Sequence, residues 1–185
     1  MSYASNVLKV INALTKTNEE QLFKKKIAII AEEIIKKTSG HKITAIFGNG
    51  GSAADAQHFA AELVCTYKSR DRKPYNAIAL TTDTSIMTAW SNDLDYESVF
   101  VRQLEALGET IGLSIGLSTS GKSKNVIEAL NFSKNNNLTT CLICGENDLD
   151  HSNFDIVLKI PSKDTGTIQT VTQVIYHSIC DALEK

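Results

Sequence analysis

The chain has 185 residues, of which 42% are hydrophobic and 22% charged, the balance of a folded globular protein rather than of a disordered one. Its formal net charge of −2 excludes the strongly basic surface typical of nucleic-acid-binding proteins. No apolar run approaches the roughly 20 residues that span a bilayer, and the first nine residues lack a signal-peptide pattern. We therefore expect one cytoplasmic domain over residues 1–185, with no nucleic-acid or membrane partner.

Residues 5–38 carry apolar side chains at helical spacing, and the polar run at 15–18 predicts a break between two helices. Short apolar runs, which are strand candidates, follow at residues 43–47, 77–80, 111–117, 138–144 and 156–160. Helix candidates lie between and after them at residues 52–67, 84–92, 96–107, 123–135 and 166–184. This regular alternation predicts an α/β fold, in which helices cover both faces of a parallel sheet. Ligands bind such sheets at the carboxyl ends of the strands, so the loops that follow the strands are the candidate sites.

Two of the four cysteines, Cys141 and Cys144, have the CxxC spacing of metal and redox sites. They fall within a predicted buried strand, where side chains three residues apart point to opposite faces of the sheet. We therefore interpret both residues as structural thiols. Reduced thiols are expected throughout, since nothing in the sequence indicates export.

The first candidate loop, Gly-Asn-Gly-Gly-Ser-Ala at 48–53, lies between a predicted strand and a predicted helix. Its glycines let backbone amides approach a ligand closely, and the helix N-terminus attracts an anion. The loop also satisfies GxGxxA, the dinucleotide fingerprint, which needs an acidic residue at the end of the next strand. Here that strand ends in Leu80-Thr81-Thr82, so the sequence argues against a nicotinamide cofactor.

The second candidate loop, Gly-Leu-Ser-Thr-Ser-Gly-Lys-Ser at 116–123, satisfies the Walker A pattern GxxxxGK[ST]. Only two strand candidates follow it, and neither ends in the aspartate that would hold magnesium in a nucleoside triphosphatase. We interpret the loop instead as a cradle for one phosphomonoester, made by helix-terminal amides and hydroxyl groups. The hydroxyls belong to Ser118, Thr119, Ser120 and Ser123. Helix capping, the simpler explanation, accounts for one hydroxyl only.

Two helices carry candidate acid–base or metal-binding side chains. His58 and Glu62 are four residues apart and share one helix face, and imidazole with carboxylate is a donor set that suits zinc. Gln169 and His177 belong to a polar stripe on the last helix. From spacing alone, a solvated helix face would explain either pair. Eight residues, about 12 Å of helix, separate Gln169 from His177, a constraint that eases if one of them serves a neighbouring subunit.

Four segments together resemble phosphoheptose isomerases of the sugar-isomerase (SIS) superfamily: residues 48–63, 79–108, 116–130 and 165–184. The resemblance implies a Rossmann-like three-layer α/β sandwich with a five-stranded parallel sheet. It also implies a homotetramer with active sites between subunits, in which residues 1–38 form a helical oligomerisation segment and residues 39–185 the α/β core. The implied cofactor is one zinc ion per subunit.

The resemblance also assigns site residues, position by position. Four match the family's zinc site: His58, Glu62, Gln169 and His177. Glu62 and His177 match its acid–base pair as well, and the four hydroxyl residues of the second loop match its phosphate site. The matches to substrate-contacting positions are Asn49, Gly50, Gly51, Ser52, Asn92 and Asp93, together with Glu62 and Gln169. The chain departs from the family where threonine replaces arginine, glutamate or histidine, at Thr66, Thr167, Thr170 and Thr172.

The implied reaction is the aldose–ketose isomerisation of sedoheptulose 7-phosphate to D-glycero-D-manno-heptose 7-phosphate, an early step of heptose biosynthesis for lipopolysaccharide or capsule. It passes through an enediol, for which we expect Glu62 to take the carbon-bound proton and His177 to exchange protons with the oxygens. The alternative is a non-catalytic SIS protein that binds or regulates a partner. One relative of that kind lacks the histidine that corresponds to His177, so the presence of this residue favours an enzyme.

Overall fold

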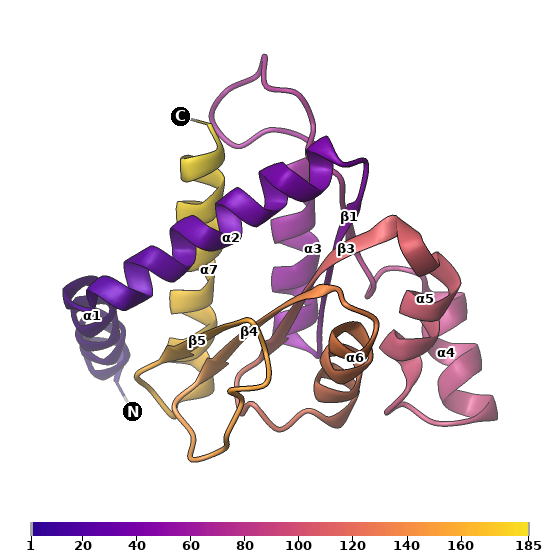
Figure 1. Cartoon of the computed structure of the whole chain (residues 1–185). Helices are drawn as coiled ribbons and strands as arrows, with labels where there is room; N and C mark the ends of the chain where they lie inside the picture. Colours follow the sequence, from indigo (N-terminus) through magenta and orange to yellow (C-terminus); the bar gives the residue numbers. More distant parts are fainter. Residues whose placement is uncertain (1, 185) are drawn as a thin grey trace.

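The structure, a computed structural model, describes residues 2–184 and is built on one five-stranded sheet (Figure 1). Neighbouring strands are parallel, and their order is β2-β1-β3-β4-β5. The strands are β1 (Ile43–Gly48), β2 (Ala77–Ala79), β3 (Ile111–Ser118), β4 (Thr139–Gly145) and β5 (Ile156–Ile160). The predicted parallel α/β fold is confirmed, while the two ends of the predicted domain, Met1 and Lys185, lie outside the described residues.

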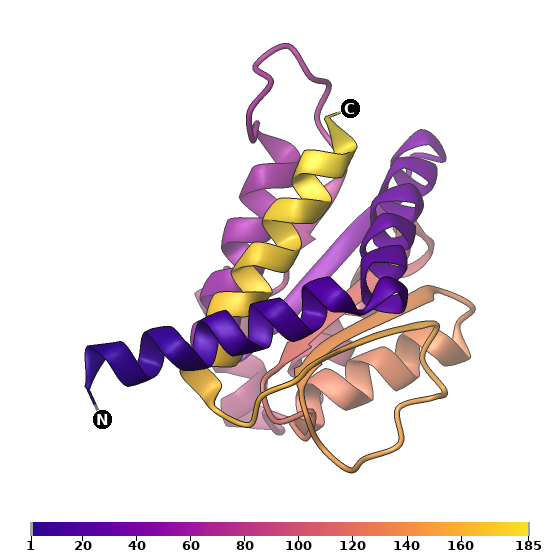
Figure 2. The ribbon, with the colours of Figure 1, turned by 90° about the vertical axis from the view of Figure 1, so that its left-hand side faces the viewer.

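Helices cover both faces of the sheet, which makes three layers (Figures 1 and 2). They are α1 (Tyr3–Glu19), α2 (Gln21–Ser39), α3 (Gly51–Val64), α4 (Thr84–Asp93), α5 (Val99–Leu107), α6 (Lys124–Asn135) and α7 (Thr165–Leu183), with a 3-10 turn at Gly108–Thr110. On one face, α2, α3 and α7 pack on buried strand residues such as Ile46 and Leu113. On the other face, α5 and α6 pack on residues such as Phe47 and Leu142. Within residues 2–184, no helix has the length and apolar character to cross a membrane.

The CxxC cysteines lie on β4 as structural thiols. Cys141 is part of the core beneath α3 and α7, whereas Cys144 is part of the core beneath α5 and α6. Both are buried and free. Because their side chains point to opposite faces of the sheet, they cannot share a metal ion or form a disulfide with each other.

The predicted break in the N-terminal helical segment is misplaced. The polar run at 15–18 stays within α1, because Thr17 is buried and its hydroxyl donates a hydrogen bond of 2.9 Å to the carbonyl of Leu14. The chain instead turns at Glu20, whose backbone is extended (φ −81°, ψ 105°). The third predicted helix is also too long, since the backbone leaves helical geometry at Cys65 (φ −86°, ψ −101°) rather than after residue 67.

The strand order places a topological switch point between β1 and β3. The chain leaves β1 toward β2 on one side and later continues with β3 on the other. Gly48, at the end of β1, pairs in register with Leu117, near the end of β3. The two candidate loops are therefore neighbours, at the place where sheets of this order bind their ligands.

Candidate active site

The loop at the end of β3, residues 118–123, is a compact turn in which hydroxyl groups and backbone amides lie close together. We call it the hydroxyl loop. The hydroxyl of Ser118 lies 2.9 Å from that of Ser123, and the amide of Gly121 donates a bond of 3.0 Å to the Ser118 carbonyl. Gly121 has φ +66°, a conformation that a residue with a side chain rarely adopts. Ser123 is the N-cap of α6, but its hydroxyl makes no capping bond. This hydroxyl therefore serves the contact with Ser118 rather than a cap of α6.

The loop after β1, residues 48–53, is equally tight, and it contacts the start of α7. We call it the glycine loop. Gly50 has φ +56° and precedes the first turn of α3. A methyl group on Gly51 would overlap the amide group of Gln169, so the loop and this side chain approach each other closely. The structure thus places Gln169 against the first loop.

An amide pair links the two loops. The Asn49 amide nitrogen donates to Asn125 Oδ1 at 2.8 Å, and the Asn125 amide nitrogen donates back to Asn49 Oδ1 at 2.9 Å. The hydroxyl of Tyr96 donates a further bond of 2.8 Å to the same Asn49 oxygen. The pair holds the glycine loop and the start of α6 in one fixed relation.

Side chains of α3 and α7 converge in a second cluster, which we call the triad: His58, Glu62 and His177. Figure 2 shows the two helices side by side. His58 Nε2 lies 3.0 Å from Glu62 Oε1, and the rings of His58 and His177 meet edge to face with centroids 5.2 Å apart. One donor atom from each residue lies within 4.8 Å of the others, the arrangement of a possible metal site. As their spacing predicted, His58 and Glu62 lie on one face of α3, and His177 joins them from α7.

The surroundings of the triad keep His177 neutral. Burial lowers the pKa of His177 below its ordinary 6.5, the nearby His58 lowers it further, and Glu62 opposes both. Burial also raises the pKa of Asp55, one turn before His58, while His58 opposes that shift. A neutral imidazole can accept a proton or bind a metal ion, so His177 is in the form that either role needs.

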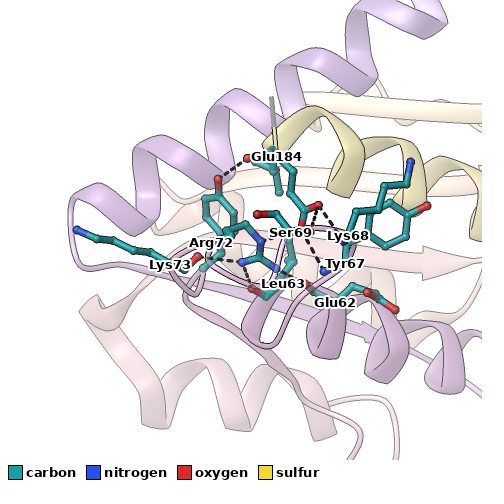
Figure 3. Close-up of polar contacts among 10 residues, drawn as sticks. Glu62, Leu63, Tyr67, Lys68, Ser69, Arg72, Lys73 and Glu184 are labelled. Carbon is teal, nitrogen blue, oxygen red and sulfur yellow. Dashed lines mark hydrogen bonds and ion pairs between the residues drawn. The ribbon is translucent and has the colours of Figure 1, made fainter.

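A buried ion pair fixes the far ends of α3 and α7 (Figure 3). Arg72 Nε donates to Glu184 at 3.0 Å, and both side chains are less than 10% exposed. The same guanidinium donates to the backbone carbonyls of Glu62 at 2.6 Å and Leu63 at 2.9 Å, the end of α3. Because Glu184 follows α7 directly, Arg72 ties together the two helices that carry the triad.

We expect the contribution of Glu184 to stability to depend on pH. Burial raises its pKa, but bonds from the amides of Lys68, Ser69 and Tyr67 and from Arg72 outweigh burial and lower it from 4.5 to about 2. The unfolded chain therefore binds the proton more readily, and the stabilisation, complete above pH 4.5, is lost as pH falls toward 2. The difference in urea unfolding free energy between wild type and Glu184→Gln is expected to shrink from pH 7 to pH 3. An equal difference at both pH values would contradict the ion-pair origin.

The predicted site residues thus fall into two groups within one chain. The loop group holds Asn49, Gly50, Gly51, Ser52, Ser118, Thr119, Ser120, Ser123 and Gln169. The triad lies farther along α3: His58 and Glu62 are seven and eleven residues beyond Gly51, about 10 and 16 Å along the helix. Asn92 and Asp93 end α4, where they are exposed and hydrogen-bonded to each other at 2.8 Å.

Several residues of the site escaped the sequence analysis. Asn125 carried a usable signal, because it lies in the first turn of α6 directly after the hydroxyl loop. Arg72 lies outside helices and strands, where no periodicity marks a residue, and Tyr96 lies before α5, although the predicted helix 96–107 included it. Tyr176 lies on α7 among buried residues, and only the packing of α7 against α3 brings its hydroxyl to His58.

The chain is similar to known proteins of one family. The sequence model of the SIS domain matches residues 2–145. A phosphoheptose isomerase from Sulfurimonas denitrificans is 45% identical over 161 residues, which is 86% of this chain and 82% of that protein. Phosphoheptose isomerase 1 from Campylobacter jejuni is 46% identical over 169 residues, 89% of each chain.

Solved structures give the same result. A phosphoheptose isomerase from Francisella tularensis superimposes with a TM-score of 0.90 at 28% identity, covering 98% of this chain and 96% of that one. The phosphoheptose isomerase from Neisseria gonorrhoeae has a TM-score of 0.85 at 32% identity, with the same coverage. The similarity therefore includes α7, which lies beyond the part matched by the SIS domain model.

Proposed function

The chain belongs to the SIS domain family and, within it, to the phosphoheptose isomerases, and on this basis we propose that it converts sedoheptulose 7-phosphate to D-glycero-D-manno-heptose 7-phosphate. The observation that carries the proposal is the convergence of a carboxylate and two imidazoles in the triad. We place the reaction in the cytoplasm, early in heptose biosynthesis for lipopolysaccharide or capsule. The triad favours this enzyme over a non-catalytic SIS binding protein, because a binding function has no need of it.

The isomerisation moves one proton between carbons and one between oxygens. Glu62 removes the proton from C1 of the ketose and returns it to C2. His177, held neutral by burial, takes the proton of the C1 hydroxyl and delivers one to the oxygen at C2. The intermediate is an enediol, and the product is the aldose. Both residues project from helices, so their relative position is set by the packing of α3 against α7.

The triad suits a zinc ion. Its donors are two imidazoles and a carboxylate, and their atoms lie within 4.8 Å of one another. Donors that share one zinc ion at about 2.0–2.2 Å are at most about 4.4 Å apart, so small side-chain rotations would bring all three onto one ion. Bound zinc would polarise the substrate carbonyl. We propose Gln169 from a neighbouring subunit as the fourth ligand, because the Gln169 amide of the same chain lies against Gly51, with the loop group rather than with the triad.

The hydroxyl loop holds the other end of the substrate. A net charge of −2 provides no general attraction for an anion, so the amides and hydroxyls at the start of α6 must bind the phosphate locally. Binding the non-reacting phosphate orients the reacting carbons. The glycine loop, with Asn49 and Ser52, and the end of α4, with Asn92 and Asp93, would contact the sugar between the two ends.

We further propose a homotetramer of one SIS domain per chain, with residues 1–38 at its core. Support comes from large apolar side chains that α1, α2 and α7 leave exposed: Tyr3, Leu8, Ile11, Leu22, Ile29, Ile35 and Val174. Burying such surface is the usual reason for oligomerisation. The separation of the triad from the loop group along α3 supports active sites between subunits, where the triad of one chain faces the loops of another.

Mixing two inactive variants tests a shared active site. Glu62→Gln removes the carboxylate, and Ser120→Asp places a negative charge in the exposed part of the hydroxyl loop, where it repels the phosphate. If sites form between subunits, co-refolding the two variants is expected to restore up to about a quarter of wild-type activity, because some interfaces pair two intact halves. Each variant alone serves as the control. No restoration in mixed oligomers, verified by native mass spectrometry, would place each site within one chain.

The function itself is tested by incubating the purified protein with sedoheptulose 7-phosphate and following the aldose by NMR. We expect the aldose to form, activity to fall after treatment with a chelator, and zinc to restore it. No aldose with or without zinc would overturn the proposed function, whereas activity that survives metal removal would overturn the zinc site alone. A parallel titration with ATP tests the Walker A interpretation, for which we expect no binding.

A further inference from the structure

Tyr176 lies behind the triad and contacts its first histidine. Its hydroxyl oxygen is 2.9 Å from His58 Nδ1, on the side of the ring away from the 3.0 Å contact between Nε2 and Glu62. We propose that Tyr176 is a positioning residue that orients His58 and lets its Nε2 act as a metal ligand. This inference rests on the proposed function and assigns a role to a residue outside the predicted site.

The geometry leaves His58 little freedom. The ring of Tyr176 is buried, with 1% of the residue exposed, and it stacks on Phe59 at 16° with centroids 5.4 Å apart. It also makes edge-to-face contacts with the rings of His58 and His177, at centroid distances of 5.3 and 4.8 Å. A rigid aromatic ring therefore places one hydroxyl group at a fixed point, and the hydrogen bond to Nδ1 fixes the rotation of the imidazole.

A hydroxyl is suited to this position because it can donate or accept. When the ring proton of His58 is on Nε2, this nitrogen donates a hydrogen bond to Glu62, and Nδ1 accepts a hydrogen bond from the hydroxyl of Tyr176. If Nε2 held a metal ion, the single ring proton would be on Nδ1, which would donate a hydrogen bond to the hydroxyl oxygen. The exchange of tautomers moves one proton off Nε2 and one onto Nδ1, so the charge of the ring is unchanged. A carbonyl or an ammonium group could serve only one of these states.

The test compares Tyr176→Phe with a matched substitution outside the triad. Phenylalanine keeps the stacked ring and removes only the hydroxyl. Tyr75→Phe is the control, since its hydroxyl also makes one hydrogen bond, of 2.9 Å, to the backbone carbonyl of Leu183. Zinc affinity is measured by competition with a chromophoric chelator, and thermal unfolding of the metal-free proteins is recorded alongside. We expect Tyr176→Phe to bind zinc about 10- to 100-fold more weakly and Tyr75→Phe to bind it as wild type does.

A second measurement does not depend on metal binding. The nitrogen NMR signals of His58 report which ring nitrogen accepts a hydrogen bond, and in the metal-free protein we expect Tyr176→Phe to shift the Nδ1 signal. Unchanged zinc affinity, or an unchanged Nδ1 signal, would overturn the positioning role. If wild type itself binds no zinc, the proposed cofactor fails, and the Nδ1 signal alone decides whether Tyr176 orients His58.

Discussion

Replacing Glu62 with glutamine is expected to lower kcat for sedoheptulose 7-phosphate by about 10²- to 10⁴-fold. The amide cannot accept the carbon-bound proton, but its oxygen can still accept a hydrogen bond from His58, which lies 3.0 Å from the carboxylate. The fold and the hydroxyl loop should therefore persist, and KM is expected to change little. Steady-state kinetics with NMR detection of the aldose measure both constants.

The proposed roles of Glu62 and His177 are separated by hydrogen exchange. In D₂O, Glu62→Gln is expected to abolish deuterium incorporation at C1, whereas His177→Ala is expected to slow isomerisation more than exchange. Glu105→Gln is the control, because this exposed helix glutamate lies outside the proposed site and makes a surface ion pair of 3.3 Å with Arg102. Wild-type turnover in Glu62→Gln, or full exchange without its carboxylate, would show that another group is the base.

Replacing Arg72 with methionine is expected to lower the melting temperature by on the order of 10 °C. The substitution leaves Glu184 buried without its partner, and it also removes the donors to the carbonyls of Glu62 and Leu63 at the end of α3. Arg72→Lys is expected to recover little, because an ammonium group cannot reproduce the planar fork of donors. Differential scanning calorimetry at pH 7 measures the change.

Two further variants identify the source of this loss. The double variant Arg72→Met, Glu184→Met is expected to be more stable than Arg72→Met alone, because it removes the unpaired buried charge. Lys68→Ala removes the neighbouring ion pair between Lys68 and Asp181, in which the two side chains are 64% and 43% exposed. Because exposed pairs contribute little, this variant is expected to change the melting temperature by about 1–2 °C at most. If Arg72→Met unfolds at the wild-type temperature, the pair does not hold α3 and α7 together.

The extent to which the site was predictable follows from the range of the interactions involved. The strands, the helices and the two loops depend on local periodicity and turn chemistry, so they could be predicted from neighbouring residues. The i,i+4 pair His58 and Glu62 was predictable for the same reason. Two helix ends were predicted at the wrong place: α1 continues to Glu19 rather than breaking at 15–18, and α3 ends at Val64 rather than at residue 67. Such ends depend on packing, which local patterns do not contain.

The contacts that support the triad instead join residues that are far apart in the sequence. Arg72 and Glu184 are 112 residues apart, and Tyr176 and His58 are 118 residues apart. No spacing rule connects such pairs, and a lone arginine or tyrosine in the sequence is as compatible with the surface as with a site. Their partners are specified only once α3 and α7 pack side by side on one face of the sheet.

The amino-acid sequence alone determined the parallel α/β fold, the two loops that follow β1 and β3, the resemblance to phosphoheptose isomerases and the residues of the triad. Tertiary structure decided that the loops adjoin at the switch point between β1 and β3, and that Gln169 lies with the glycine loop while His177 joins His58 and Glu62. The physical reason is that hydrophobic periodicity specifies which face of each element is buried, whereas the partner of that face is chosen by the packing of the whole chain.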